Sequence, residues 1–202
     1  MNFLRQYIEN MIDIDENDWN KVTTLFTKKE YTKGQKLFHA GDVCQKLYYV
    51  SSGVVRVYSL STEGKDFTWM INYNKDSYQL DPFSADIVSY LTQQESLFFA
   101  ETLEDCIIYE ANFEELDALY ASSLKWMTLS RNILNRQLIT VVERTQMMQR
   151  LTAKEKYELM KVIAPVYEEV LPDYQFATVL GITPQSLSRI KREMTDVVDH
   201  FK

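Results

Sequence analysis

Residues 173–192 read DYQFATVLGITPQSLSRIKR, and this stretch decides the fold of the C-terminal part of the chain. Two helices that cross at a steep angle need a small residue at their contact and a turn residue that tolerates positive φ. Ala177 and Gly181 meet these two needs. Proline is accepted in the first turn of a helix, so Thr183 can cap a second helix that begins at Pro184. The stretch predicts a helix-turn-helix, with the shared apolar residues Phe176, Leu180, Ile182, Leu187 and Ile190.

The other face of the second helix is polar. Gln185 and Arg189 carry groups that bond base edges, because glutamine matches adenine and arginine matches guanine. The serines there suit phosphate or flanking contacts, and the basic residues beside them suit backbone neutralisation. The plainer alternative is a pair of helices with a polar surface. The pattern favours DNA binding, with candidate residues Thr183, Gln185, Ser186, Ser188, Arg189, Lys191 and Arg192.

Charge is distributed unevenly along the chain. The net charge of −7 by itself argues against nucleic acid as a partner. Residues 1–122 carry a net charge of −10, residues 123–150 carry +4 and residues 151–202 carry −1. Within the last part, residues 189–192 hold three basic side chains and no acidic one. The acidity therefore belongs to the front half, and a basic surface lies where DNA would bind.

Residues 122–150 contain no glycine or proline and predict one long helix. Its apolar residues recur at alternating steps of three and four, which is the heptad pattern of a coiled coil. At ~1.5 Å per residue the helix would be about 40 Å long, too long for a small domain to cover. The pattern favours a parallel homodimer over packing on the chain's own β-domain, although Arg131 weakens the seam. The predicted dimer contacts are Leu134, Leu138, Val141, Thr145 and Met148.

The front half predicts a different architecture. Apolar residues at helical spacing between Phe3 and Phe26 predict two short helices, the second capped by Asp18. From Lys29 onward, short β-rich runs separated by turn residues predict an antiparallel sandwich or barrel. Within it, Val54–Leu60 alternates as a half-buried strand would. Further strands are predicted at 67–73, 96–102 and 106–111, and a short helix at 82–91.

A new helix is predicted to start at Thr152. Threonine followed three residues later by Glu155 forms a capping box, which satisfies two backbone N–H groups at a helix start. It would end the long helix at Leu151. We therefore expect an α+β protein in three parts, namely an N-terminal β-domain (1–121), a dimerisation helix (122–150) and a C-terminal helix-turn-helix domain (151–202).

Motifs in both halves match those of a known family. The front half contains Lys33-Gly34, Gly41-Asp42, LYYV at 47–50 and SGVVRVY at 52–58, and the terminal part contains LGITPQSLSRIK at 180–191. The chain thereby resembles the catabolite-activator/Fnr superfamily of bacterial regulators, especially Bacteroidetes-like versions. The resemblance implies a jelly-roll-like double-stranded β-helix as a cyclic-nucleotide-binding-like sensor domain, a dimerising helix and a DNA reader. It also implies double-stranded DNA and a second copy as partners, with RNA polymerase as a further candidate.

The expected cyclic-nucleotide site departs from the family pattern. The resemblance places the ribose-binding Gly-Glu pair at Leu80-Asp81, and the phosphate-binding Arg-Ser-Ala run at Glu95-Ser96-Leu97. Two like charges about 4 Å apart repel by about 4 kcal/mol at an effective dielectric constant of 20, whereas arginine would attract the phosphate by as much. We therefore expect a degenerate effector pocket (Leu80, Asp81, Glu95 and Ser96) that binds neither cAMP nor cGMP. Nearby aromatic residues suit an apolar ligand or, more plainly, a core: Tyr73, Tyr78, Phe83, Tyr90, Phe98 and Phe99.

The DNA reader departs from the family pattern as well. The family's acidic residue in the second helix is replaced by Gln185, and the basic residue before it by Pro184, whereas Arg189 is retained. Cytosine readout by glutamate is thus lost. Ten residues follow Arg192, which we expect to be too few for the β-wing of many relatives.

Composition excludes several function classes. Cys44 and Cys106 are too few for an iron–sulfur cluster or zinc knuckle and are expected to be buried thiols. A metal oxygenase of the cupin type would need two or three histidines, and His39 and His200 lie far apart, so no metal, haem or other cofactor is expected. No stretch approaches the roughly 20 apolar residues of a membrane span, and no signal peptide is recognised, so a cytoplasmic location without membrane contact is expected.

The sequence thus predicts a dimeric, sequence-specific DNA-binding transcription regulator that is not an enzyme. The alternative is a β-roll that binds a ligand or a protein without binding DNA.

Overall fold

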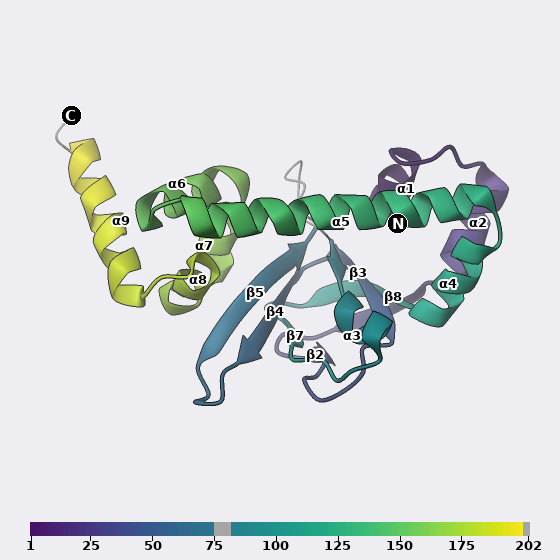
Figure 1. Ribbon diagram of the computed structural model, residues 1–202, viewed down its shortest axis with the longest axis horizontal. Coiled ribbons are helices and arrows are strands. Elements are labelled where there is room, and N and C mark those ends of the chain that lie inside the picture. Colours follow the sequence, from purple (N-terminus) through teal and green to yellow (C-terminus); the bar gives the residue numbers. More distant parts are fainter. Residues whose placement is uncertain (75–81, 200–202) are drawn as a thin grey trace.

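The computed structural model describes residues 1–74 and 82–199 (Figure 1). A β-roll packs against one side of a long helix, and shorter helices lie near both ends of that helix. In chain order the elements are α1 (Asn2–Glu9), α2 (Glu16–Thr24), β1 (Thr27–Tyr31), β2 (Lys36–Phe38), β3 (Lys46–Ser52), β4 (Val54–Leu60), β5 (Asp66–Tyr73), β6 (Phe83–Ser84), α3 (Ile87–Thr92), β7 (Phe99–Thr102), β8 (Cys106–Asn112), α4 (Phe113–Ala121), α5 (Leu124–Arg150), α6 (Ala153–Ile163), α7 (Val166–Val170), α8 (Asp173–Leu180) and α9 (Pro184–Asp199).

The strands form two antiparallel four-stranded sheets, ordered β1-β8-β3-β6 and β2-β7-β4-β5. Their inner faces share one apolar core, in which Val50, Ala100 and Ile108 are fully buried. A tight turn joins β3 of one sheet to β4 of the other at Gly53, which has φ +91°. A Cβ there would lie 2.8 Å from the carbonyl oxygen of Asp105, so only glycine fits. The antiparallel sandwich predicted from the sequence is confirmed.

Three features of the front half differ from the prediction. The second helix is capped by Asp15, whose carboxylate accepts a hydrogen bond from the backbone N–H of Asp18, so the prediction that Asp18 is the cap was wrong. Asp18 instead occupies the third helical position and pairs with Lys125 of α5. The run 82–91 predicted as a helix divides into strand β6 and helix α3, and the strand predicted from residue 96 begins only at Phe99.

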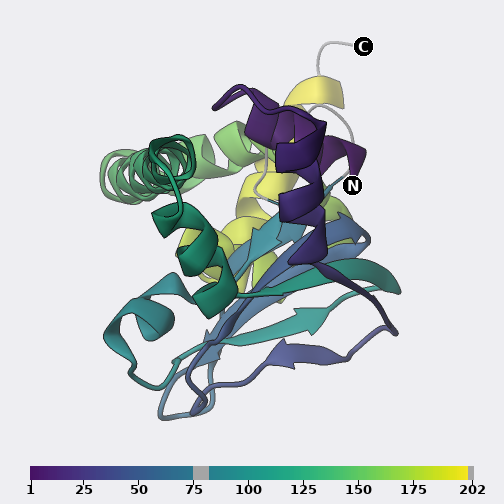
Figure 2. The ribbon, with the colours of Figure 1, turned by 90° about the vertical axis from the view of Figure 1, so that its right-hand side faces the viewer.

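Helix α5 runs past the β-roll from α4 to α6 (Figure 1). Only Trp126 and Leu129 near its start are buried. Figure 2 shows the helix end-on, with one side facing away from the rest of the chain. It ends at Leu151, whose backbone is extended, and α6 follows with the predicted capping box between Thr152 and Glu155.

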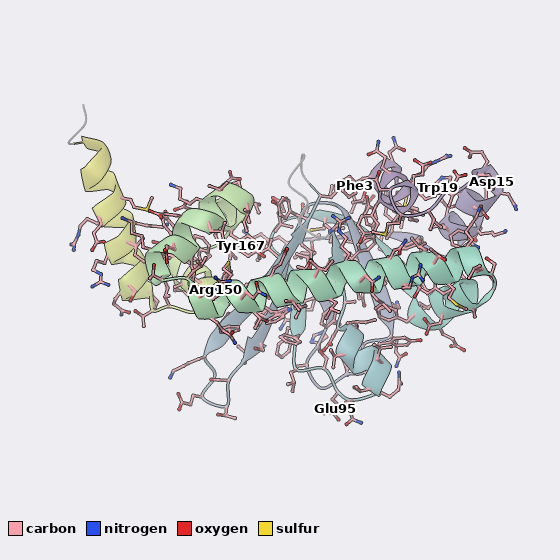
Figure 3. All side chains as sticks on the ribbon, turned by 45° about the horizontal axis from the view of Figure 1, so that its top comes forward. Phe3, Asp15, Trp19, Glu95, Arg150 and Tyr167 are labelled. Carbon is pink, nitrogen blue, oxygen red and sulfur yellow. The ribbon has the colours of Figure 1, made fainter. Side chains whose placement is uncertain are left out.

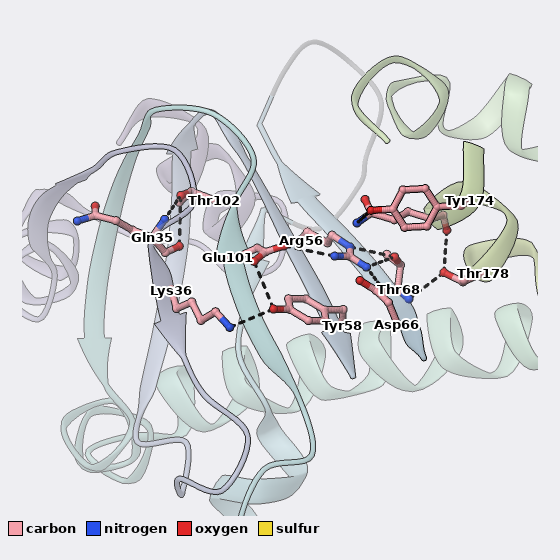
Figure 4. Close-up of polar contacts among 11 residues, drawn as sticks. Gln35, Lys36, Arg56, Tyr58, Asp66, Thr68, Glu101, Thr102, Tyr174 and Thr178 are labelled. Atoms are coloured by element: carbon pink, nitrogen blue, oxygen red, sulfur yellow. Dashed lines mark hydrogen bonds and ion pairs between the residues drawn. The ribbon is translucent and has the colours of Figure 1, made fainter. Parts of the chain in front are cut away.

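The C-terminal helices cover the edge of the second sheet, where β5 is the outermost strand. On the side of β5 that has no neighbouring strand, two side-chain hydroxyls accept hydrogen bonds from its backbone N–H groups. The Ile71 N–H donates to the hydroxyl of Tyr167 on α7 at 3.0 Å, and the Thr68 N–H donates to the hydroxyl of Thr178 on α8 at 2.9 Å (Figure 4). Burial raises the pKa of Tyr167, so its hydroxyl stays neutral. The helices are thereby attached to β5 through backbone groups that would otherwise be left unpaired.

This attachment also changes the burial of the neighbouring strand β4. Val54–Tyr58 is buried on both faces, rather than on one face as its alternating sequence predicted. On the outer face, Val54 packs with the C-terminal helices. Arg56 lies fully buried, hydrogen-bonded to Thr68 and paired with Asp66 and Glu101, so three strands are joined by one guanidinium (Figure 4).

Replacing Tyr167 by phenylalanine is expected to lower the free energy of unfolding by about 1–3 kcal/mol, because the buried Ile71 N–H loses its acceptor. Thermal unfolding followed by circular dichroism should show a Tm lower by several degrees. Tyr174→Phe is the matched control, since Tyr174 is 53% exposed and, within residues 1–74 and 82–199, its hydroxyl bonds the side chain of the adjacent Gln175 alone. Equal Tm values for both variants would contradict this account of the β5 edge.

Candidate functional site

The turn between α8 and α9 has the geometry that the sequence predicted. Gly181 has φ +65°, and the N–H of Ile182 donates to the carbonyl of Ala177 at 3.0 Å, which closes α8 with a Schellman motif. Ala177 is fully buried at the helix contact. A Cβ on Gly181 would lie 2.6 Å from Cε of Met148, so the turn also touches the end of α5. The turn therefore contacts the helix that was predicted to form the dimer.

The start of α9 is fixed by Thr183. Its hydroxyl accepts a hydrogen bond from the backbone N–H of Ser186 at 3.1 Å and shares a second, at 3.0 Å, with the Ser186 hydroxyl. Pro184 occupies the first helical position, where a missing N–H costs nothing. Thr183 and Ser186 thus position the helix, and their hydroxyls are already engaged with each other.

Four predicted DNA-binding residues lie together on the outer face of α9. Gln185, Ser188, Arg189 and Arg192 are exposed, at steps of three and four that place them on one side of a helix. The opposite side, with Leu187 and Ile190, is buried in the C-terminal core. Among the described residues, Arg189 forms one ion pair, a weak and exposed contact of 3.8 Å with Glu193. The arrangement presents an amide, a hydroxyl and two guanidinium groups to a partner.

Lys191, unlike the four exposed residues, forms ion pairs with neighbouring helices. Its ammonium lies 2.7 Å from Asp173 and 3.0 Å from Glu168, so it connects α9 to α8 and α7. Burial lowers its pKa, but the hydrogen bonds to both carboxylates raise it more, and the pKa is raised overall. The sequence assigned Lys191 to neutralising DNA phosphates. The two ion pairs balance the charge of Lys191 within the chain and hold α9 against α7 and α8.

The predicted dimer residues of α5 form an exposed stripe. Leu134, Leu138 and Val141 are 50%, 64% and 48% exposed, far more than isolated leucines and valines in a core. Thr145 is exposed and Met148 is partly covered by the turn at Gly181. The stripe continues with Ile139 and Val142, which are also exposed. An apolar surface of this length on one helix is typical of a protein interface.

Of the residues aligned with the cyclic-nucleotide site, Glu95 and Ser96 lie in the described part of the chain. Ser96 is buried, and its hydroxyl donates to Asp86 at 2.7 Å and accepts from the Phe98 N–H, so it holds a loop together. Glu95 is exposed at the far side of the β-roll from α5 (Figure 3). Leu80 and Asp81 lie outside the described residues, as do Tyr78 and His200.

The described residues hold no group of three or more His, Cys, Asp or Glu side chains that could bind a metal ion. Cys44 and Cys106 are buried free thiols, as expected. Among the helices of residues 1–74 and 82–199, none combines the length and hydropathy needed to cross a membrane.

Comparisons with known proteins agree with this geometry. Residues 28–123 match the cyclic nucleotide-binding domain family. An "anaerobic regulatory protein" of Haemophilus influenzae is 22% identical over 88% of this chain and 70% of its own length. A "fumarate and nitrate reduction regulatory protein" of Vibrio cholerae is 29% identical over 52% of this chain, which spans only 40% of that relative.

Solved structures agree on the fold. The c-di-GMP responsive global regulator CLP of Xanthomonas campestris superposes with a TM-score of 0.66 at 14% identity, over 90% of this chain and 92% of its own. At this identity the superposition concerns the fold alone. It covers the β-roll, the long helix and the terminal helices together.

Proposed function

Because the chain belongs to the catabolite-activator/Fnr superfamily of transcription regulators, we propose that it binds specific DNA sequences as a homodimer through α9. Its relatives are regulatory proteins, and the prediction that it is not an enzyme is confirmed on that ground. The observation that carries the DNA-binding proposal is the face of α9, where Gln185, Arg189 and Arg192 are exposed while the opposite side is buried.

The two-fold symmetry of such a dimer determines the DNA site. Each subunit would place one α9 in a major groove, with the two grooves on the same side of the duplex. The half-sites are then inverted repeats about 34 Å apart, one helical turn. Selecting bound fragments from random duplexes, or mapping bound sites across a genome, tests this directly. Enrichment of a palindromic motif supports the proposal, and retention of random duplexes without any motif contradicts it.

The effector pocket of this regulator does not bind cyclic nucleotides. At the position aligned with the phosphate-binding arginine, Glu95 carries a negative charge on an exposed loop, and the neighbouring Ser96 hydroxyl is occupied by internal hydrogen bonds. Isothermal titration with cAMP and with cGMP at millimolar concentration should therefore release no binding heat. Saturable micromolar binding of either nucleotide would mean that this loop had been aligned wrongly.

The competing proposal is a β-roll that binds a ligand or a protein without DNA. A regulator that neutralises phosphates loses affinity for duplex DNA steeply with salt, because condensed counterions are released on binding. Duplex binding that is measurable and salt-dependent therefore separates the two proposals. We further propose that the protein acts in the cytoplasm and that, like other members of the family, it contacts RNA polymerase.

A further inference from the structure

A second site lies between the β-roll and the helices that cover it. A cavity of about 230 Å³ is enclosed by α1, α2, α3, α4 and α5 together with strands β3, β5 and β6. It includes neither Glu95 nor Ser96, so it does not coincide with the residues aligned to the phosphate-binding run. Of the described members of the predicted aromatic set, Phe83 and Tyr90 line it.

The walls of the cavity are apolar and partly aromatic. Tyr7 meets Phe83 edge to face with ring centroids 5.1 Å apart, and Tyr90 stacks on Phe113 at 4.4 Å. Aromatic side chains in a cavity wall favour an aromatic ligand, which can make edge-to-face or offset-stacked contacts with them. An engineered apolar cavity of about 150 Å³ stays dry and takes up benzene, so the larger volume here has room for one substituted ring or two fused rings.

The polar groups of the lining are few, and they disfavour a charged ligand. Asp117 is the only ionised side chain that lines the cavity among the described residues, and it accepts a 2.6 Å hydrogen bond from the Tyr90 hydroxyl. No described lysine or arginine lines the cavity, so an anion would be buried without a counter-charge, at a high cost.

Two hydroxyls of the lining can still bond a ligand. Neither the Tyr120 hydroxyl nor the Ser130 hydroxyl makes a hydrogen bond to another described residue. Burial, with a smaller effect of Asp117, raises the pKa of Tyr120 to about 12, so the phenol remains a hydrogen-bond donor at neutral pH.

We propose that this cavity binds a small, uncharged aromatic molecule with one polar substituent, which Tyr120 and Ser130 recognise. The ligand would contact the dimerisation helix directly, because Leu134 belongs both to the cavity wall and to the exposed stripe of α5. Ile87 and Leu91 of α3, which are 39% and 67% exposed, form the rim through which it enters. The ligand class deepens the proposed function, since it names the effector of the same regulator, but binding itself does not depend on DNA.

The test uses phenol and indole as uncharged probes and benzoate as a charged probe of similar size, titrated into the full-length protein and followed by ligand-observed NMR. Phenol or indole should bind saturably with one site per chain, and benzoate should not. Since DNA is absent from the assay, a failure here is distinguishable from a failure of the DNA-binding proposal. Benzoate binding as tightly as phenol, or saturable binding of neither neutral probe, overturns the proposal.

Variants localise the binding. Ile133→Trp from α5 and Ala85→Leu from the β-roll both fill the cavity, and each should weaken the binding of the neutral probes at least tenfold. Two variants from different elements are used so that misfolding of one does not decide the result.

Tyr120→Phe should weaken phenol binding about 3- to 10-fold, which corresponds to one neutral hydrogen bond, and should leave toluene binding unchanged. Val162→Trp, on the exposed surface of α6, is the control. Unchanged binding in both filled variants places the probes elsewhere and contradicts the proposal.

Discussion

Replacing Leu138 and Val141 by glutamate is expected to convert the protein to monomers and to remove its binding to specific DNA. Both side chains lie on the exposed stripe of α5, and a dimer through this stripe would bring each new carboxylate beside its copy in an apolar contact. Loss of the second α9 removes the gain from binding two half-sites at once, which is about 10²- to 10⁴-fold in affinity. Light scattering should report the mass of one 23.8 kDa chain instead of two.

The matched control places the same charges elsewhere. Val162 and Ile163 at the end of α6 are 70% and 45% exposed, so their double change to glutamate is comparable in hydrophobicity and charge. It should leave the protein dimeric and its DNA affinity close to that of the wild type. A Leu138/Val141 double variant that remains dimeric would refute the assignment of the stripe.

Changing Arg189 to alanine is expected to flatten the preference for one base in each half-site. The Arg189 side chain is 66% exposed, and among the described residues it forms one ion pair, at 3.8 Å with Glu193, so its guanidinium is available to form two hydrogen bonds with guanine. Losing such a bidentate contact typically costs ~1–3 kcal/mol and relaxes selectivity at that position. Selection from random duplexes, compared with the wild type, should show the loss at a single position of the motif.

Arg192→Ala is the appropriate comparison, because Arg192 is exposed on the same face and is predicted to contact the phosphate backbone. It should weaken binding to all sequences alike and lower the slope of log affinity against log salt by about one. Lys191→Ala is unsuitable as a phosphate probe, since it would also break the contacts to Glu168 and Asp173. If Arg189→Ala weakens specific and random DNA equally, Arg189 contacts phosphate and the base assignment is wrong.

The parts of the fold that follow local rules could be predicted from the sequence. The capping box at Thr152, the left-handed turn at Gly181 and the cap at Thr183 each depend on residues within a few positions of one another. The exposed stripe of α5 could be predicted for a related reason, because a heptad pattern is a property of one helix.

Contacts between segments that lie far apart in the sequence could not be predicted from it. Nothing local to Tyr167 or Thr178 indicates that these hydroxyls accept hydrogen bonds from a strand about a hundred residues earlier. For the same reason the sequence did not reveal that Lys191 is paired with Glu168, or that eight elements enclose a cavity around Tyr120. The choice of Asp18 over Asp15 as a cap failed differently, because both aspartates satisfy the same local rule.

The exposed edge of β5 is covered by helices that are synthesised later, and this affects folding during translation. The backbone N–H of Thr68 gains its hydrogen-bond acceptor only after Thr178, 110 residues later, has been synthesised. At about 5–20 residues per second, the strand would leave the ribosome roughly 5–20 s before the helices that cover it. During that interval its open edge is a template for pairing with other nascent chains. A polypeptide that stops short of α7 should therefore be prone to aggregation, even though its β-roll is complete.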